Sequence, residues 1–397
     1  MGSLLLFTQM YAPEVGAAAN RMNRLSKFAA VAGYAVDVVS WFPHYPQRRI
    51  YDGYQGWFHC ENIDDVAVRR FRPVVPKPTL IRRTLAEGWL AAGATLLGLL
   101  GRRPDVVYAT TPSPLLSIAG LVVSTVRRSR FVLEVRDLTW RYPSAITGRE
   151  LNWVERMLER VMLWVAHHAD LVVTTTAEQA EFFTKHGLPE EKLAVVPNGV
   201  SRDDLKEEVP WPENSRRPFT VMYAGLVGLP QGLQVLVDAA NILREHPIEF
   251  VVVGDGLEKP KLQQLCADKG LTNVQFCDAV PKKRLTKYYE RADVLFAHLR
   301  GADAFATALP SKLLEYMATA RPVVFGGRGV AAELITRARS GIAVPPENPE
   351  ALADAILRLY EAPDQGREYG SRGRQYVTQN YCSDDLLTYL FTRIKQL

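Results

Sequence analysis

Apolar runs and amphipathic stretches alternate along the first half of the chain. Residues 3–8 form an apolar run typical of a buried parallel strand, and a polar loop over residues 9–16 leads into helical periodicity from Ala17 to Ala32. A second apolar run covers residues 34–41. Strand, loop, helix and strand in this order form the unit from which doubly wound sheets are built. Further strands of the same kind are predicted at residues 105–110, 131–135, 169–175 and 193–196.

The same alternation begins again after residue 218. Residues 201–218 are rich in acidic residues and contain three prolines, which is typical of a linker. Beyond them, strands are predicted at residues 219–224, 250–253, 274–276, 294–297, 322–325 and 342–344. Helical periodicity covers residues 232–245 and 351–359, and a long helical region runs from 364 to 397. Alternation of this sort predicts a second parallel sheet and therefore an α/β protein of two Rossmann-like domains.

Composition narrows the class of protein without identifying a partner. A chain of 397 residues with 47% hydrophobic and 23% charged residues can build two or three ordinary cores. A net charge of +5 permits an anionic ligand or an anionic membrane surface. The cysteines, which form no close pair, are Cys60, Cys266, Cys277 and Cys382. We therefore expect no disulfide framework and no metal site, and a cytoplasmic location, since no signal peptide pattern is present.

Residues 41–83 combine aromatic and basic side chains. The aromatic set is Trp41, Phe42, His44, Tyr45, Tyr51, Tyr54, Trp57 and Phe58, and the basic set is Arg48, Arg49, Arg69, Arg70 and Arg72. Such a mixture suits single-stranded nucleic acid or a membrane interface. It equally suits a long loop and edge hairpin held in place by its own aromatic residues. Nucleic-acid binding is the least favoured of these, because the basic residues form no continuous run.

Residues 80–100 predict an apolar helix flanked by arginine pairs. Its uncharged stretch from Gly88 to Gly101 is fourteen residues long, which is short of the roughly 20 needed to span a membrane. The helix is then either buried in a Rossmann-type core or interfacial. We favour a core helix with one lipid-facing side.

Two loops of the first half carry candidate chemistry, because the carboxyl ends of parallel strands are where such sheets bind ligands. After the first strand come Glu14 and Gly16, where glycine would let backbone approach a ligand closely. After the strand at residues 131–135 come Arg136 and Asp137. From the pattern alone, a structural ion pair is at least as well supported for this last pair as a catalytic role.

The stretch from Ala306 to Phe325 carries the strongest signal. Pro310 and Ser311 open a helix that contains Lys312 and Glu315, and the helix leads into a strand at residues 322–325. A loop that feeds a helix N-terminus is suited to an anion, because free N–H groups and the positive end of the dipole meet there. A carboxylate one turn further in could hold sugar hydroxyls. These are the parts needed to bind a nucleotide diphosphate and its ribose.

This stretch resembles the donor-site motif of the GT-B retaining glycosyltransferases of family 4, in the branch that makes bacterial surface polysaccharides of the O-antigen, capsule and colanic-acid type. The matching residues are Pro310, Ser311, Lys312, Glu315, Tyr316, Met317, Ala318, Pro322 and Val323. The opening with Glu14, Gly16 and Arg21, the run from Glu134 to Leu138 and the Pro197-Asn198-Gly199 element resemble the same branch. The resemblance covers nearly the whole chain.

The resemblance implies a GT-B fold of two Rossmann-like domains facing a central cleft, with the last helix crossing back to the first domain. The implied divisions are an acceptor domain at 1–200, a linker at 201–218, a nucleotide-sugar domain at 219–376 and the crossing helix at 377–397. The implied reaction is retaining transfer of a hexosyl or N-acetylhexosaminyl group from a nucleotide sugar, most commonly a UDP-sugar, to a polyprenyl-diphosphate-linked saccharide. The implied enzyme lies at the inner face of the cell membrane and needs no metal or other cofactor.

The resemblance also assigns residues to roles. Glu315 would bind the ribose, and residues 309–312 with the loop Gly225–Gly228 would bind the diphosphate. Residues 276–280, which include Cys277, would flank the base. The implied donor-nucleotide set is Leu309, Pro310, Ser311, Lys312, Glu315, Gly225, Gly228, Gly254, Gly256 and Cys277. The implied sugar and acceptor set is Glu14, Gly16, Arg21 and Thr307, with Arg136 and Asp137 as the catalytic pair.

Three positions depart from the family pattern. Thr307 stands where many members have a second glutamate, and Leu226 and Gln231 stand where many have an arginine and a lysine in the glycine loop. The diphosphate charge would then be met by backbone, by Lys312, or by Arg300 or Arg328. Two other classes stay open: a nucleotide-sugar 2-epimerase on the same scaffold, and a non-catalytic partner subunit of a glycosyltransferase complex.

Overall fold

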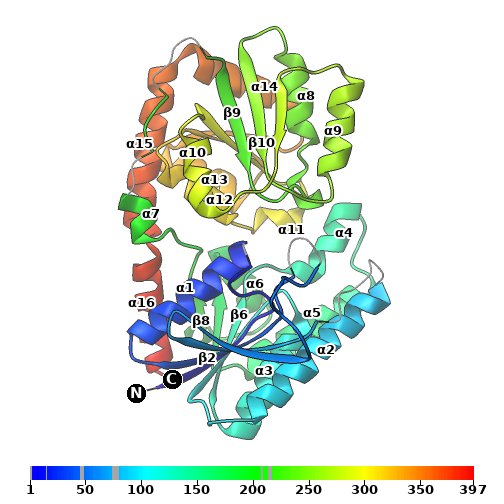
Figure 1. Cartoon of the computed structure of the whole chain (residues 1–397), viewed down its shortest axis with the longest axis vertical. Helices are drawn as coiled ribbons and strands as arrows, with labels where there is room; N and C mark the ends of the chain where they lie inside the picture. Colours follow the sequence, from blue (N-terminus) through cyan, green and yellow to red (C-terminus); the bar gives the residue numbers. More distant parts are fainter. Residues whose placement is uncertain (1, 15, 45–48, 74–79, 207–208, 213–216) are drawn as a thin grey trace. The chain divides into compact units, whose positions relative to one another are not determined.

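The computed structural model describes residues 2–14, 16–44, 49–73, 80–206, 209–212 and 217–397 (Figure 1). Tyr45 and Arg48 of the aromatic and basic region, and Glu207, Glu208, Asn214 and Ser215 of the predicted linker, lie outside the described residues. The chain forms two compact units. Unit 1 comprises residues 1–141, 151–197 and 386–397, and unit 2 comprises residues 142–150 and 198–385.

Unit 1 contains an eight-stranded sheet in the order β3-β4-β2-β1-β5-β6-β7-β8. Its strands are β1 (Ser3–Phe7), β2 (Ala35–Trp41), β3 (Phe58–Ile63), β4 (Val66–Phe71), β5 (Val106–Thr110), β6 (Arg130–Val135), β7 (Leu171–Thr174) and β8 (Leu193–Val195). All neighbours pair in parallel except β3, which forms an antiparallel edge hairpin with β4. The continuous apolar runs of β1 and β5 fit this, since parallel strands are covered on both faces.

Helices cover both faces of this sheet. One face carries α1 (Ala17–Val31) and the second half of α16 (Ser383–Lys395), whose Phe391 ring lies 5.6 Å from that of Phe28. The other face carries α2 (Leu80–Leu99), α3 (Pro114–Arg127), α5 (Trp153–His168) and α6 (Ala177–Lys185). A capping box starts α5: the Asn152 side chain accepts from the Glu155 N–H, and the Glu155 side chain accepts from the Asn152 N–H. Short elements complete the unit: η1 (Thr139–Arg141) and η2 (Glu190–Lys192).

Unit 2 contains a six-stranded, fully parallel sheet in the order β11-β10-β9-β12-β13-β14. Its strands are β9 (Phe219–Ala224), β10 (Ile248–Val253), β11 (Val274–Cys277), β12 (Val294–His298), β13 (Val323–Gly326) and β14 (Gly341–Val344). One apolar cluster joins the sheet to α8 (Gln234–Ile242), α9 (Lys259–Asp268) and α14 (Pro349–Glu361). On the other face lie α10 (Lys282–Tyr289), α11 (Asp303–Ala306), α12 (Ser311–Ala318), α13 (Val330–Ala338) and α15 (Pro363–Asn380).

Three further short elements belong to unit 2: α4 (Tyr142–Thr147), α7 (Arg202–Lys206) and η3 (Leu229–Gln231). The Tyr142 ring of α4 lies 4.9 Å from the ring of Phe305 in α11. The long helical region predicted at 364–397 is two helices, because the chain bends at Tyr381 and Cys382. There the Val200 N–H donates to the Tyr381 carbonyl, and the Ser383 N–H donates to the Val200 carbonyl.

The predicted α/β architecture of two doubly wound domains is confirmed. The edge hairpin in residues 41–83 is present, and its aromatic residues are mainly structural. Arg70 is fully buried, donates to the Trp41 carbonyl at 3.0 Å and stacks between Tyr11 and Tyr54. Trp41 and Phe42 are buried as well, whereas Trp57 and Phe58 are exposed. Most of this aromatic and basic region therefore holds the fold together.

Candidate active site

The carboxyl edge of the unit 2 sheet is built from two glycine loops that touch through their backbones. The first follows β9 and begins at Gly225, and the second follows β10 and contains Gly254 and Gly256. A Cβ at Gly254 would lie 1.9 Å from the Gly225 carbonyl oxygen, and one at Gly256 would lie 2.1 Å from the Val227 oxygen. Neither position can hold a side chain, so these glycines set the shape of the edge.

Helix α12 is fastened to the end of β9 by Tyr316, which lies in the second half of the helix. The Tyr316 hydroxyl donates to the Ala224 carbonyl at 2.8 Å and accepts from the Ala224 N–H at 2.7 Å. The predicted donor motif therefore lies directly beside the first glycine loop. Since the first amides of a helix lack intrahelical partners, this junction offers several N–H donors to an anion.

Lys312 is the cation at this junction. Its ammonium lies 3.9 Å from the centre of the Tyr223 ring and donates to the Tyr223 hydroxyl, which in turn donates to the Leu226 carbonyl. A Cβ at Gly225 would lie 2.8 Å from the Lys312 Nζ. Burial lowers the pKa of Lys312 to about 7, and the neighbouring Glu315 carboxylate only partly opposes this.

Glu315 lies one helical turn after Lys312 and is partly exposed. Its carboxylate forms no hydrogen bond or ion pair with any residue that the structure describes. The structure thus brings together a low-pKa lysine, an uncommitted carboxylate and two glycine loops. Leu309 is buried beneath them, and Pro310 and Ser311 begin the helix.

A neutral histidine organises the next strand end. His298, the last residue of β12, has its Nδ1 2.7 Å from the Gln231 carbonyl oxygen and its Nε2 2.9 Å from the Glu347 nitrogen. A carbonyl needs a donor and an N–H needs an acceptor, so the ring carries its proton on Nδ1. Burial lowers the pKa of His298, which favours this neutral form. The ring joins the first glycine loop to the segment after β14.

Two buried polar atoms beside His298 have no hydrogen-bond partner within the described part of the chain: Gln231 Oε1 and Arg300 Nε. The Arg300 side chain lies against Gly232, where an added Cβ would be 3.0 Å from its Cγ. Arg328, the other candidate for the diphosphate, pairs with Asp303 at 2.6 Å. Thr307 is the C-cap residue of α11 and precedes α12 in the chain.

Lys259, which the sequence analysis does not single out, fixes the segment around Cys277. This nearly buried side chain of α9 donates to the Cys277 carbonyl at 3.0 Å and to Asp278 Oδ1 at 2.9 Å. The Gly254 N–H donates to the same carbonyl at 3.2 Å. The position expected to flank a base is therefore held from two sides.

In unit 1, the carboxyl ends of β5 and β6 surround a buried carboxylate. Glu134 is fully buried and accepts from Arg21 Nε at 2.7 Å, from the Tyr108 hydroxyl at 2.8 Å and from the Thr110 hydroxyl at 2.7 Å. Burial acts to raise the pKa of Glu134, but the Arg21 and Arg136 guanidinium groups hold it below its usual value. The carboxylate is therefore a fixed negative charge inside the unit.

The two residues after β6 take up different surroundings. The Arg136 backbone is anchored, since its N–H donates to the Thr111 hydroxyl at 3.0 Å and its carbonyl accepts from Thr175 and Gln179. Its Nε is buried and has no hydrogen-bond partner among the described residues. Burial lowers the pKa of Arg136, while Glu134 acts in the opposite direction. Asp137 follows it in the chain and is partly exposed.

The three other unit 1 candidates lie near the first loop. Glu14 is buried and accepts from the His44 N–H at 2.9 Å. Arg21 is largely buried: besides Glu134 it donates to the Pro197 carbonyl at 2.7 Å and to the Val196 carbonyl at 2.9 Å. Gly16 is the residue before α1. Glu14 and Arg21 are thus held by partners inside the fold, while Gly16 stays partly exposed.

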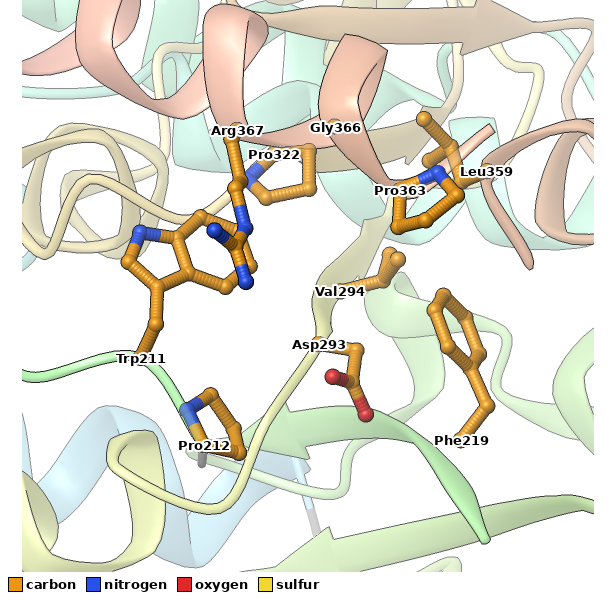
Figure 2. Close-up of a pocket in the computed structure, with 10 residues that line it drawn as sticks. All are labelled: Trp211, Pro212, Phe219, Asp293, Val294, Pro322, Leu359, Pro363, Gly366 and Arg367. Atoms are coloured by element: carbon orange, nitrogen blue, oxygen red, sulfur yellow. The ribbon is translucent and has the colours of Figure 1, made fainter. Parts of the chain in front are cut away.

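A separate pocket of unit 2 lies at the opposite edge of the sheet (Figure 2). It is lined at the amino ends of strands by Phe219, Asp293 and Pro322, and Trp211 and Arg367 flank it. Its volume of about 50 Å³ holds a few water molecules and is too small for a nucleotide. The Arg321 and Arg367 guanidinium groups lie over the Trp211 ring there. The pocket is therefore the place where Trp211, within the predicted linker, packs against unit 2.

Among the residues that the structure describes, no group of His, Cys, Asp and Glu side chains is arranged to hold a metal ion. The cysteines Cys60, Cys266, Cys277 and Cys382 are all free thiols.

Two family models match the chain, one on each half. Residues 16–199 match a model described as a glycosyl transferase 4-like domain, and residues 218–362 match one described as glycosyl transferases group 1. The chain belongs to this glycosyltransferase family, and its fold is of the GT-B type.

Several known proteins are similar to this chain over nearly its whole length. A protein of Escherichia coli (strain K12) whose name assigns it to colanic acid biosynthesis, the glycosyl transferase WcaI, is 26% identical over 96% of this chain and 99% of its own length. The sucrose-phosphate synthase from Thermosynechococcus elongatus has a TM-score of 0.79 at 18% identity and covers 100% of this chain and 99% of its own. Anabaena Alr3699/HepE, solved in complex with UDP and glucose, has a TM-score of 0.73 at 17% identity over 99% of each chain.

Proposed function

We propose that the protein transfers a sugar from a UDP-sugar to a polyprenyl-diphosphate-linked saccharide, with retention of configuration, in the synthesis of a cell-surface polysaccharide. The observation that carries the proposal is the junction of the first glycine loop with α12, where Lys312 and the uncommitted Glu315 lie one turn apart. The naming of the colanic acid relative and the UDP complex of the structural relative support it.

Within this proposal, unit 2 holds the donor. Glu315 accepts from the ribose hydroxyls, and the amides at residues 309–312 and the Gly225–Gly228 loop donate to the diphosphate. Lys312 supplies the positive charge that Leu226 and Gln231 do not. Cys277, held by Lys259, lies beside the base. Binding of this kind orients the donor and stabilises the charge that develops on the departing diphosphate.

Unit 1 holds the acceptor in the same proposal. Arg136 and Asp137 follow β6 at the carboxyl edge of the sheet, where doubly wound domains bind their ligands. Arg136 brings a positive charge. Its Nε has no hydrogen-bond partner among the described residues, and the buried Glu134 carboxylate favours its charged form. Asp137 is the group within reach of an acceptor hydroxyl proton. No protein nucleophile is included, since the departing diphosphate can itself assist proton removal. A lipid-linked acceptor implies work at the cytoplasmic face of a membrane.

Calorimetric titration with UDP and then GDP tests the donor site. Wild type is compared with Glu315→Ala and with Glu361→Ala, a matched control at an exposed carboxylate at the end of α14. We expect binding that weakens by about tenfold or more in Glu315→Ala, because one charged hydrogen-bonding partner is lost, and that is unchanged in Glu361→Ala. Failure of wild type to bind either nucleotide would overturn the proposal in favour of a non-catalytic partner subunit.

A second candidate, a nucleotide-sugar 2-epimerase, uses the same donor site and needs no acceptor. The product distinguishes this candidate from the glycosyltransferase: an epimerase incubated with its UDP-sugar alone would release a UDP-sugar epimer. We expect no epimer to form, and we expect sugar to leave the nucleotide only when a lipid-linked acceptor is added.

A further inference from the structure

Most of the large apolar side chains that are exposed in the described part of unit 1 lie on three neighbouring helices. α2 packs against α3 and α3 against α5, on the same side of the sheet (Figure 1). Their exposed apolar residues are Leu85, Trp89, Leu96 and Leu100 on or directly after α2, Val122 and Val126 on α3, and Trp153, Met157 and Trp164 on α5. We call these residues the α2–α3–α5 face.

The exposed residues of α2 form a stripe at helical spacing. Leu85, Trp89, Ala92 and Leu96 follow one another at steps of four, three and four residues, and Leu100 continues the series just beyond the helix. Leu85 is 65% exposed and Leu96 is 53% exposed. A separate stripe, which includes Leu90 and Ala94, is buried in the core. The helix therefore has two apolar sides: one is buried in the core of unit 1, and the other is exposed.

The tryptophans favour an interface between water and lipid as the environment of this face. Four of the seven tryptophans are exposed, and three of them, Trp89, Trp153 and Trp164, lie on the face itself. The fourth, Trp57, lies beside it, with its ring 6.3 Å from that of Trp89. Indole rings are favoured at the headgroup level of a membrane, where one side is apolar and the other is wet.

The charges around the face have one dominant sign. Its three helices carry three carboxylates: Glu87 accepts from Ser113, Glu155 belongs to the capping box of α5, and Glu159 accepts from Trp140 and Arg141. All three are therefore engaged within the fold. The arginines on α3 and α5 or directly after α2 and α3 are Arg102, Arg103, Arg127, Arg128, Arg156 and Arg160. Arginine around an apolar surface is complementary to anionic headgroups.

We propose that the α2–α3–α5 face docks unit 1 on an anionic lipid bilayer, with its leucines and tryptophans at the acyl boundary and its arginines on the headgroups. Among the described residues no helix is long and apolar enough to cross a membrane, so the contact is one of lying on the surface. The docking face depends on the proposed function only for its biological role, which would be to bring the acceptor domain to a lipid-linked substrate. It places the membrane contact on these helices and not on the aromatic and basic residues of 41–58, of which Trp41, Phe42 and His44 are buried.

Vesicle flotation tests the proposal on the full chain. The vesicles are phosphatidylcholine alone or phosphatidylcholine mixed with phosphatidylglycerol, at low and at high salt. We expect wild type to bind the anionic vesicles. Leu85→Gln and Leu96→Gln should each weaken binding by about tenfold, because each removes one apolar side chain from the acyl boundary. Arg102→Gln and Arg160→Gln should each weaken it by about fivefold, and only at low salt.

Matched controls come from exposed apolar residues elsewhere. Val31→Gln lies on α1, on the other side of the sheet, and Leu257→Gln lies in unit 2; these side chains are 90% and 71% exposed. Both variants should bind vesicles as wild type does. The proposal is overturned if wild type does not float, if the stripe variants float like wild type, or if sedimentation shows that the face joins protein subunits instead.

UDP titration of the same variants separates this proposal from the proposed function. Stripe variants that lose vesicle binding should still bind UDP as wild type does. Vesicle binding without any UDP binding would overturn the proposed function and leave the docking face in place. UDP binding without vesicle binding would overturn the docking face alone.

Discussion

Replacing Lys312 with methionine removes the cation that the structure places beside Gly225 and Tyr223, and it keeps nearly the same volume. The wild-type ammonium lies against the Tyr223 ring and beside Gly225, in a site where burial lowers its pKa from 10.5 to about 7. That change in pKa corresponds to a free-energy cost of about 5 kcal/mol for holding the ammonium in its charged form in this site. Without a ligand, Lys312 is therefore about half protonated near pH 7.

A bound diphosphate supplies the opposite charge that Lys312 lacks. We expect donor binding to raise the pKa of Lys312 again, because a nearby anion favours the ammonium. A charge-assisted hydrogen bond of this kind contributes about 1.5–3 kcal/mol, so Lys312→Met should weaken donor binding by roughly 10-fold to 100-fold at about pH 6. Above about pH 7 the wild type must take up a proton to bind, so its affinity should fall by up to about tenfold for each pH unit.

Calorimetry with a UDP-sugar between about pH 6 and about pH 9 measures this dependence. A UDP-sugar is preferable to UDP, since the terminal phosphate of UDP itself titrates near pH 6. Repeating the titration in two buffers of different ionisation enthalpy gives the number of protons taken up. We expect uptake approaching one proton near pH 8 for wild type and none for Lys312→Met. Equal affinities at pH 6, or parallel pH curves for the two proteins, would refute the assignment of Lys312 to the diphosphate.

Four further outcomes are expected from buried side chains of the two units. Lys312→Met should be more stable than wild type near pH 6, and this advantage should shrink between about pH 7 and pH 10.5, because only the unfolded wild type stays protonated there; urea unfolding at several pH values measures it. Tyr316→Phe removes both hydrogen bonds to Ala224 and should lower the free energy of unfolding by about 1–3 kcal/mol. Arg21→Met leaves Glu134 without its buried partner and should cost about 3–5 kcal/mol. Since the pKa of Glu134 is lowered in the fold, the stability that it contributes should be lost as the pH falls below its unfolded value of 4.5 through the lower folded one.

The alternation of apolar runs predicted the strands of both sheets other than β3 and β4, because buried parallel strands leave a local pattern in the sequence. The predicted helix at Pro310 to Ala318 is equally local, and Lys312 and Glu315 lie together because they share that helix. The helical region after residue 364 was predicted as well, and its division at Tyr381 and Cys382 accompanies pairing with Val200, far away in the chain.

The contacts that shape the edge of the unit 2 sheet could not be predicted in the same way. Tyr223 meets Lys312 across 89 positions, and His298 meets Gln231 across 67. Nothing in the neighbouring sequence marks a tyrosine or a histidine as the partner of a distant loop. The surroundings of Tyr54 could not be predicted for the same reason, since the buried Arg70 that contacts its ring lies on β4, farther along the chain.

The chain passes between the two units four times, at 141–142, 150–151, 197–198 and 385–386. Unit 1 is consequently not a contiguous piece of the gene: the side chains that cover α1, among them Leu390, Phe391 and Ile394, are synthesised only after the whole of unit 2. During translation this apolar surface of α1 stays uncovered until all of unit 2 has been synthesised, however early the rest of unit 1 has formed. Removing residues 386–397 should therefore damage the first domain to be made, and the two halves should not survive as separately expressed fragments cut at the linker.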